Sequence, residues 1–205
     1  MSAPRTRPLV VLGLAAAAAA VLLAAVQQWT AGPIAEQAEQ RAQATLTQLL
    51  PRGSYDNDPI RDRFPARIAG LEAPATIHRA RRDGRPVALM ADVTTMDGYS
   101  GPIRLLIAVE PSGEVLGVRV LEHRETPGLG DRIERDRSDW IDEFDGRALG
   151  DPPIDDWRPD RRGGAFDTLS SATITSAAVI DAVRRVLAWQ RDHRERIFDI
   201  PSVTE

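Results

Sequence analysis

Two kinds of hydrophobic pattern divide the chain. Residues 9–26 are almost wholly Leu, Val and Ala, and no charged residue occurs from Pro8 to Ala35. Such a stretch is close to the roughly 20 residues that a helix needs to span a bilayer. Further along, apolar residues alternate with polar ones or recur at helical spacing, as they do in a folded domain. The pattern therefore predicts a transmembrane helix over residues 8–29 and one folded domain after it.

Charges on either side of the apolar stretch predict its orientation. Arg5 and Arg7 precede it, whereas Glu36 and Glu39 follow it. Because basic residues are enriched on the cytoplasmic side of membrane helices, we expect residues 1–7 in the cytoplasm and the domain outside. A cleaved signal peptide is the alternative, but the uncharged stretch is longer than a usual signal core. We interpret the chain as a single-pass inner-membrane protein whose main domain is periplasmic.

A change of period marks the elements that follow. Residues 36–50 have apolar or small positions at helical spacing, and residues 51–75 are rich in Pro, Gly, Asp and Arg, so that residues 30–75 are interpreted as a helix and a connecting segment. Alternating apolar positions predict three strands, over residues 87–93, 103–109 and 116–120. A short helix is predicted at Asp139–Phe144.

The last strong element is a helix near the C-terminus. Helical spacing predicts it over Ser176–Arg191, and Thr175 or Ser176 is the expected N-cap. Together these elements predict an α+β fold with an antiparallel sheet and flanking helices. They form a single domain over residues 76–195, followed by a tail at residues 196–205.

Composition removes several classes of function. The 205 residues include no cysteine and no lysine, which excludes disulfides, thiolate catalysis, cysteine-bound metal clusters and lysine Schiff bases in this chain. The net charge of −4, with interspersed signs, lacks the basic surface that nucleic-acid binding needs. We expect structural or surface roles for the three isolated histidines, His78, His123 and His193. We expect neither a metal site nor a catalytic side-chain constellation. Redox chemistry here needs a non-thiol cofactor.

Residues 167–176 carry the strongest candidate chemistry. They read Asp-Thr-Leu-Ser-Ser-Ala-Thr-Ile-Thr-Ser and place six hydroxyl residues at the start of the last helix. The free amides and the positive end of a helix dipole favour a phosphate at such a place. Local chemistry alone nevertheless favours a plainer interpretation, in which Ser and Thr only cap the helix.

The same run resembles a flavin-attachment motif. That motif, S/T-G-A-T-x-T, is similar to residues 170–175 and belongs to the FMN-binding domain of the G subunit of Rnf/Rsx complexes and of the related C subunit of the sodium-pumping NADH:quinone reductase. Two further stretches, Asp97–Gly101 and Glu122–Asp131, are similar to the Rnf-type protein in particular. The resemblance implies that a flavin transferase esterifies FMN to Thr173. Ser171 stands where the family has Gly, which costs on the order of 1 kcal/mol if the position requires a positive φ.

The resemblance also implies which residues surround the flavin. The expected cofactor-binding residues are Thr173, Ser170, Ser171, Ala172, Thr175, Tyr99, Ser100, Glu125, Thr126, Gly128 and Leu129. Among these, Tyr99 and Leu129 are candidates for an apolar wall along the isoalloxazine ring. Thr126, Gly128 and Ser100 are expected to bring backbone amides to its polar edge. Glu125 is expected to shape the loop, with tuning of the flavin or acceptance of a hydrogen bond as the alternative.

An electron-transfer component of a complex is the function that the resemblance implies. FMN accepts and donates electrons, while the protein sets its position. The implied partners are the A, B, C, D and E components of an Rnf/Rsx complex, which couples electron flow between ferredoxin and NAD to ion movement across the inner membrane. The alternatives are a membrane-anchored assembly module without flavin, for which Ser171 is the only hint, and a flavoprotein of another chain, such as the C component of the sodium pump or a regulator of nitrous-oxide respiration. The loop Glu125–Asp131 favours the Rnf-type protein.

Overall fold

The computed structural model describes most of the chain beyond its N-terminal region. The described residues are 10–22, 45, 49–50 and 53–202. The chain divides into two units, residues 1–41 and residues 42–205, and the second contains the sheet.

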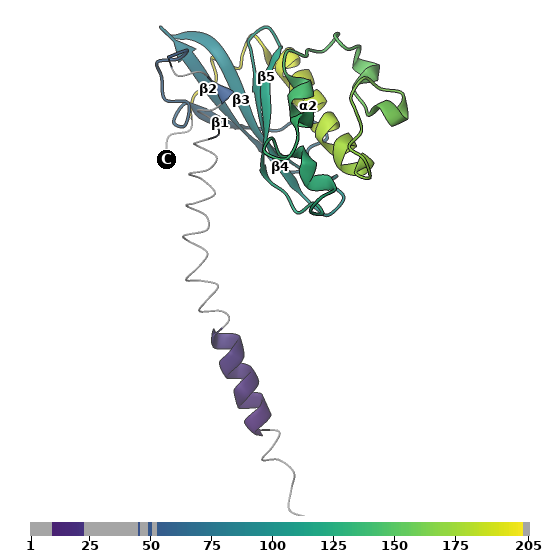
Figure 1. The fold of residues 1–205 in the computed structure, drawn as a ribbon. Coiled ribbons are helices and arrows are strands. Elements are labelled where there is room, and N and C mark those ends of the chain that lie inside the picture. Colours follow the sequence, from purple (N-terminus) through teal and green to yellow (C-terminus); the bar gives the residue numbers. More distant parts are fainter. Residues whose placement is uncertain (1–9, 23–44, 46–48, 51–52, 203–205) are drawn as a thin grey trace, which may run out of the picture. The chain divides into compact units, whose positions relative to one another are not determined.

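The first unit includes one described helix, over residues 10–22 (Figure 1). This helix lies within the transmembrane helix predicted over residues 8–29, whose remaining residues are outside the described ones. Among the helices that the structure describes, none combines the length and the apolar character needed to cross a bilayer. The helix predicted over residues 36–50 also falls mostly outside the described residues.

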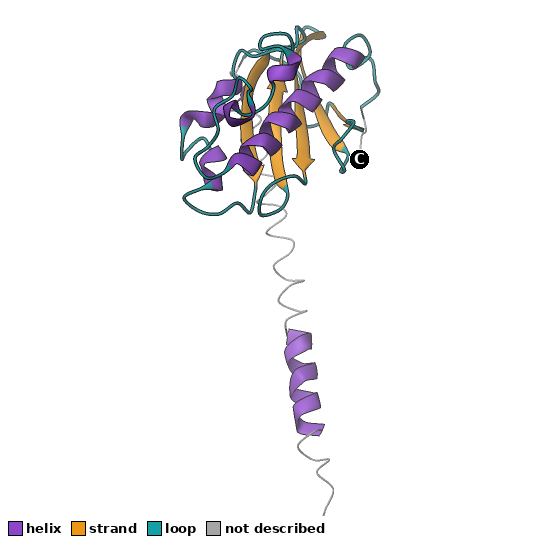
Figure 2. Cartoon of the chain, turned by 90° about the vertical axis from the view of Figure 1, so that its right-hand side faces the viewer, coloured by secondary structure: helices purple, strands orange, loops and turns teal. Residues whose placement is uncertain are grey.

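A five-stranded antiparallel sheet forms the centre of the second unit, and each strand pairs with the next one along the chain (Figure 2). The strands are β1 (Arg63–Ala66), β2 (Ala75–Arg82), β3 (Arg85–Thr95), β4 (Ile103–Val109) and β5 (Val115–Glu122). The predicted antiparallel sheet and the α+β class are confirmed, and the three predicted strands correspond to β3, β4 and β5. The first two strands were not predicted, and β1 lies within the segment interpreted as a connection.

Strand alternation assigns the sheet's two faces to different partners. In β4, Ile103, Leu105 and Ile107 belong to the main core under α2 (Thr173–His193), whereas Leu106 and Ala108 belong to a second cluster on the other face. That second cluster includes the buried pair Leu49 and Leu50 and the partly buried Tyr55 and Ile60. Because both faces are covered, β4 is buried almost throughout.

The helix α2 lies across one face of the sheet (Figure 2). Its apolar positions Val179, Val183, Val186 and Leu187 are all buried, as their helical spacing predicted. The helix starts three residues earlier than predicted, at Thr173, and ends at His193. This early start determines the geometry of the candidate site described below.

Four short 3-10 helices connect β5 to α2. They are η1 (Gly130–Ile133), η2 (Asp139–Phe144), η3 (Ile154–Asp156) and η4 (Asp160–Arg162). The short helix predicted at Asp139–Phe144 is thus present as η2. The polar stretch after η2 contains two core residues, Trp157 and Phe166. Their ring centroids lie 6.4 and 5.0 Å from that of Phe144.

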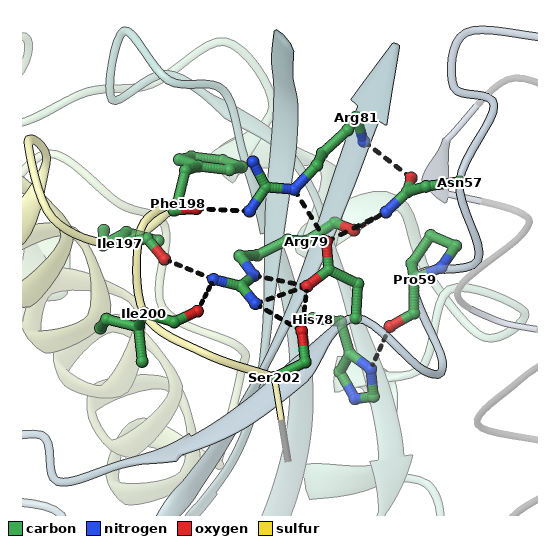
Figure 3. Close-up of polar contacts among 10 residues, drawn as sticks. Asn57, Pro59, His78, Arg79, Arg81, Ile197, Phe198, Ile200 and Ser202 are labelled. Atoms are coloured by element: carbon green, nitrogen blue, oxygen red, sulfur yellow. Dashed lines mark hydrogen bonds and ion pairs between the residues drawn. The ribbon is translucent and has the colours of Figure 1, made fainter. Parts of the chain in front are cut away.

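A buried polar cluster, the Arg79 cluster, joins β2 to the C-terminal segment (Figure 3). The Arg79 guanidinium donates to the carbonyl oxygens of Ile197 and Ile200 at 2.9 and 2.5 Å, to the Ser202 hydroxyl at 2.8 Å and to the Asp62 carboxylate at 2.8 Å. Arg81 donates to the same carboxylate at 2.8 Å and to the Phe198 carbonyl oxygen at 2.5 Å. The C-terminal segment is therefore held to the sheet through hydrogen bonds from two arginines.

Candidate functional site

A pocket of about 540 Å³ lies at the N-terminal end of α2. Three segments form its walls: the loop after β3, the loop between β5 and η1, and the chain entering α2. Its lining residues are Tyr99, Glu125, Thr126, Leu129, Gly130, Ser171, Ala172, Thr173, Ile174 and Thr175. The volume falls within the range of about 300–1,000 Å³ that small-molecule sites occupy.

The start of α2 differs from the predicted capping arrangement. The N-cap position is Ala172, and among the described residues no side chain caps the helix by a hydrogen bond. The prediction that Thr175 or Ser176 caps the helix is therefore wrong. Since the first amides of a helix have no partner within it, they remain available to a ligand at the pocket, and the first turn carries no acidic residue that would repel an anion.

The hydroxyls around the helix start differ in their hydrogen bonding. Thr175 is buried and donates to the Glu125 carboxylate at 2.6 Å. Ser176 is also buried; it donates to the Ala172 carbonyl oxygen and accepts from the Leu169 amide, both at 3.1 Å. Within the described part of the chain, the Thr173 hydroxyl makes no hydrogen bond, and its side chain is only half-buried. Thr173 therefore offers the pocket a hydroxyl that the fold does not use.

Ser171 adopts the backbone conformation in which glycine is favoured. Its φ is +66°, in the left-handed region, where a side chain costs on the order of 1 kcal/mol relative to glycine. The position at which this chain has Ser171 and the family has glycine therefore does have a positive φ. The turn retains the shape that lets the chain enter α2 with Thr173 at its first residue.

Glu125 connects the three walls of the pocket. Glu125 is 5% exposed, and its carboxylate accepts from the Ser100 amide at 3.1 Å as well as from the Thr175 hydroxyl. A Cβ atom built on Gly130 would lie 2.8 Å from the Glu125 side chain, so that a larger residue at 130 would displace it. Glu125 thus fixes the loop after β3 and the helix start relative to its own loop.

Most of the predicted cofactor residues lie together, but three do not line the pocket. Ser100 contributes only its amide, to Glu125. Gly128 has a φ of +80°, a conformation that favours glycine, and is absent from the pocket lining. Ser170 faces a neighbouring hollow that Arg132 and Glu143 also line.

Two lining residues, Gly130 and Ile174, were not among the predicted ones. Ile174 was overlooked because it occupies the variable position of the attachment motif. Ile174 is 48% exposed although it is strongly apolar, and Tyr99 and Leu129 are 69% and 42% exposed. Large apolar side chains that gather in the open around one hollow are typical of a binding site. An aromatic ring system in the pocket would cover them.

The residues present fit a ligand with a phosphate at one end and a flat ring at the other. The uncapped helix start suits the phosphate, and the exposed apolar side chains suit the ring. A family model described as an FMN-binding domain matches residues 98–188, which include every lining residue of the pocket. The fold and the pocket thus define a domain of the FMN-binding class. A second family model, described as the RnfG N-terminal region, matches residues 7–49.

Similar proteins extend the match over nearly the whole chain. The G component of the ion-translocating oxidoreductase complex of Pseudomonas aeruginosa strain UCBPP-PA14 is 43% identical over 195 residues, which cover 94% of this chain and 91% of that protein. The protein of the same name from Photorhabdus laumondii is 39% identical, covering 96% and 95%, and that from Escherichia coli O157:H7 is 38% identical, covering 96% of both. The chain belongs to this family, the RnfG proteins of ion-translocating oxidoreductase complexes, and the resemblance seen in its motifs is confirmed.

Proposed function

We propose that this protein is the covalent-FMN electron-transfer component of an Rnf-type complex, with FMN esterified through its phosphate to Thr173. The observation that carries the proposal is the unused Thr173 hydroxyl at the first residue of α2, facing the pocket of an FMN-binding domain. Bound FMN would supply the redox chemistry, since it accepts and donates electrons. The side chains bind and orient it, and none acts as a catalytic acid, base or nucleophile.

The phosphate would lie against the first turn of α2. An ester at Thr173 puts its charge beside amides that lack helical partners and at the positive end of a 21-residue helix. Ser171 and Ala172 bring the chain to this point through the left-handed turn. The helix start is thereby stabilised by the ligand itself, in place of a side-chain cap.

The ring would lie along Tyr99 and Leu129, opposite the attachment point. Both side chains line the pocket and leave apolar surface open. Thr126 lines the same wall beside Glu125 and would offer its amide or hydroxyl to the polar edge of the ring. The loop between β5 and η1 therefore supplies both apolar and polar contacts to one ring.

The family also supports a place for this chain in the cell. The similar proteins take their name from an ion-translocating oxidoreductase complex. We place the N-terminus of this chain in the cytoplasm, residues 8–29 in the inner membrane and the FMN-binding domain in the periplasm, on the charge asymmetry of the flanks. Its partners would be the A, B, C, D and E components, with electron transfer between ferredoxin and NAD coupled to ion translocation. A flavin transferase would load the FMN.

Two substitutions at one residue test the attachment. The full-length chain is produced together with a flavin transferase as the wild type, as Thr173→Val and as Thr173→Ser, and flavin fluorescence is read in a denaturing gel. Valine keeps the β-branched shape of threonine without the hydroxyl. We expect fluorescence from the wild type and none from Thr173→Val, with unchanged melting temperatures of the unloaded chains. Thr173→Ser keeps a hydroxyl and should retain some label.

The proposal fails if Thr173→Val carries as much covalent flavin as the wild type. It also fails if the wild type carries none when a flavinylated protein produced in the same cells shows that the transferase is active. The second result would favour the assembly module without flavin.

A further inference from the structure

His123 follows β5 directly, and both of its ring nitrogens are engaged. Nδ1 accepts a hydrogen bond from the Glu125 backbone amide at 3.0 Å. Nε2 lies 2.6 Å from the Glu134 carboxylate, just beyond η1. The side chain is only 12% exposed, so these contacts are largely shielded from water.

The two contacts define the protonation of the ring. Because a backbone N–H can only donate, Nδ1 must carry a lone pair and the proton must be on Nε2, from where it is donated to Glu134. A proton on Nδ1 would point at the Glu125 amide and break that bond. The Glu125 backbone position therefore requires an acceptor at this one atom.

Further polar contacts connect His123 to the other end of the loop between β5 and η1. Glu134 accepts from Arg137 at 3.2 Å, and the hydrogen bond from His123, more than that from Arg137, lowers the Glu134 pKa below its usual value. The Arg137 guanidinium lies 3.1 Å from the nearly buried Asp131 carboxylate, close enough for an ion pair although without hydrogen-bond geometry. Residues 125 and 131, near the two ends of the loop that lines the pocket, are thus connected through polar side chains.

We propose that His123 is a positioning residue for the flavin, holding the Glu125 backbone through Nδ1 so that the Glu125 carboxylate stays against the loop after β3 and the start of α2. This proposal rests on the proposed function for its ligand. The path is short: the ring holds the Glu125 amide, and the Glu125 carboxylate accepts from the Ser100 amide and the Thr175 hydroxyl. Two of the pocket's three walls are therefore positioned relative to the third through one imidazole nitrogen.

Two amide side chains separate the roles of the ring nitrogens. In His123→Asn, the side-chain oxygen can take the place of Nδ1, whereas the contact with Glu134 is lost. In His123→Gln, the longer side chain reaches the place of Nε2 and leaves the Glu125 amide without an acceptor. Glu134→Gln is the matched control, because it removes the charge beyond the ring and keeps a hydrogen-bond partner for Nε2.

The first readout does not need flavin. In full-length chains that also carry Thr173→Val, amide hydrogen exchange is measured by mass spectrometry on peptides covering residues 122–131. We expect His123→Gln to speed exchange at Glu125 by about fivefold or more, as loss of a hydrogen bond predicts. His123→Asn and Glu134→Gln should stay close to the parent chain. Equal exchange in the Asn and Gln chains would overturn the proposal.

The second readout uses the flavinylated full-length chains. The visible circular dichroism and the midpoint potential of the bound flavin should shift in His123→Gln and remain near wild type in His123→Asn. A purely structural role predicts the same spectra in both variants once folded, and that result would also overturn the proposal. If the wild type carries no flavin, the proposed function fails, whereas the exchange experiment still decides whether His123 positions Glu125.

Discussion

The Arg79 cluster and the pocket at the start of α2 are both built from polar groups, but they treat those groups in opposite ways. In the Arg79 cluster the guanidinium, whose side chain is 2% exposed, donates to two carbonyl oxygens, a hydroxyl and a carboxylate (Figure 3). In the pocket the first turn of α2 has no side-chain cap, and the Thr173 hydroxyl has no partner among the described residues.

The contrast helps to separate structural from functional polar groups. A buried polar group is costly unless it is hydrogen-bonded, so a cluster that satisfies itself serves the fold. A hollow that leaves donors free, beside open apolar side chains, is completed only by a ligand. Residue type does not make this distinction: in the pocket Thr175 donates a hydrogen bond, whereas Thr173 has no hydrogen-bond partner in the part of the chain that the structure describes.

Removing the cation from the Arg79 cluster should have the largest effect on stability. Arg79→Met leaves the Asp62 carboxylate and two carbonyl oxygens without their main donor. Breaking one partner of a buried pair costs about 3–5 kcal/mol, and since Asp62 keeps Arg81 we expect about 3 kcal/mol. Denaturant unfolding of the full-length chain, followed by tryptophan fluorescence, measures it.

The control is an arginine in an exposed ion pair. Arg61 is 88% exposed at its side chain and pairs with Asp58 at 3.6 Å. Arg61→Met should change the free energy of unfolding by less than about 0.5 kcal/mol. Equal losses of unfolding free energy in Arg61→Met and Arg79→Met would contradict this expectation. They would show that the buried hydrogen bonds of Arg79 do not stabilise the C-terminal segment.

Thr175→Val should have the next largest effect, because it deletes the hydroxyl that the pocket already uses. The Glu125 carboxylate then loses a buried donor, at a cost of about 2 kcal/mol for a hydrogen bond to a charged group. Flavin loading should also fall, since the helix start and the loop are no longer connected. Thr168→Val, whose hydroxyl donates to exposed Asp160, is the control and should leave both melting temperature and loading unchanged. If Thr175→Val is destabilised but still loads flavin fully, the hydrogen bond between Thr175 and Glu125 is not needed for flavin binding.

Ser171→Gly should be stabilising. Glycine relieves the left-handed φ of +66°, and we expect a gain of about 1 kcal/mol, reduced by the greater freedom of glycine in the unfolded chain. Ser170 is exposed and is not among the residues with positive φ, so Ser170→Gly should be neutral or slightly destabilising. Thermal melting compares the two. Destabilisation by Ser171→Gly would show that the serine side chain contributes something that the turn geometry does not explain.

Acid should weaken the Arg79 cluster modestly. Partial burial acts to raise the pKa of Asp62, but hydrogen bonds from Arg81, Ser202 and Arg79 outweigh it and hold the pKa below its usual value. A carboxylate with a lowered folded-state pKa stabilises the fold above its unfolded pKa, and this contribution is lost as the pH falls through the lower, folded value. Melting temperature should therefore fall below about pH 4, and less steeply in Asp62→Asn. The same pH dependence of melting temperature in the wild type and in Asp62→Asn would show that Asp62 does not cause the loss of stability in acid.

Parts of the fold followed from local pattern alone. The strands β3, β4 and β5 and the apolar face of α2 are visible in the sequence because their apolar residues recur at the period of a strand or of a helix. The strand β2 was missed because its polar residues, including Arg79, are buried by a segment more than a hundred residues away. Trp157 and Phe166 were missed for a related reason, since only the folded chain brings them onto Phe144.

The sequence predicted the part of the candidate site that carries a motif. It did not predict the contacts that depend on the packing of the folded chain. The motif at residues 170–175 indicated the chain that enters α2, of which residues 171–175 line the pocket, and its missing glycine indicated the strained turn that Ser171 occupies. The start of α2 was placed three residues too late because Thr175 and Ser176 were taken for caps, whereas one binds Glu125 and the other binds Leu169 and Ala172. The role of His123 had no local signal, because its partners are set by the folded loop.

The attachment of FMN to Thr173 is tested by locating the flavin on the wild-type chain. Cleavage after arginine releases residues 163–184 as one peptide, which contains all six hydroxyl residues of the attachment run. Fragmentation of this peptide by mass spectrometry, after production with a flavin transferase, assigns the modified residue. We expect FMN on Thr173 alone. FMN on Thr175 or Ser176, whose hydroxyls the fold already uses, or on Ser170 or Ser171, would contradict it.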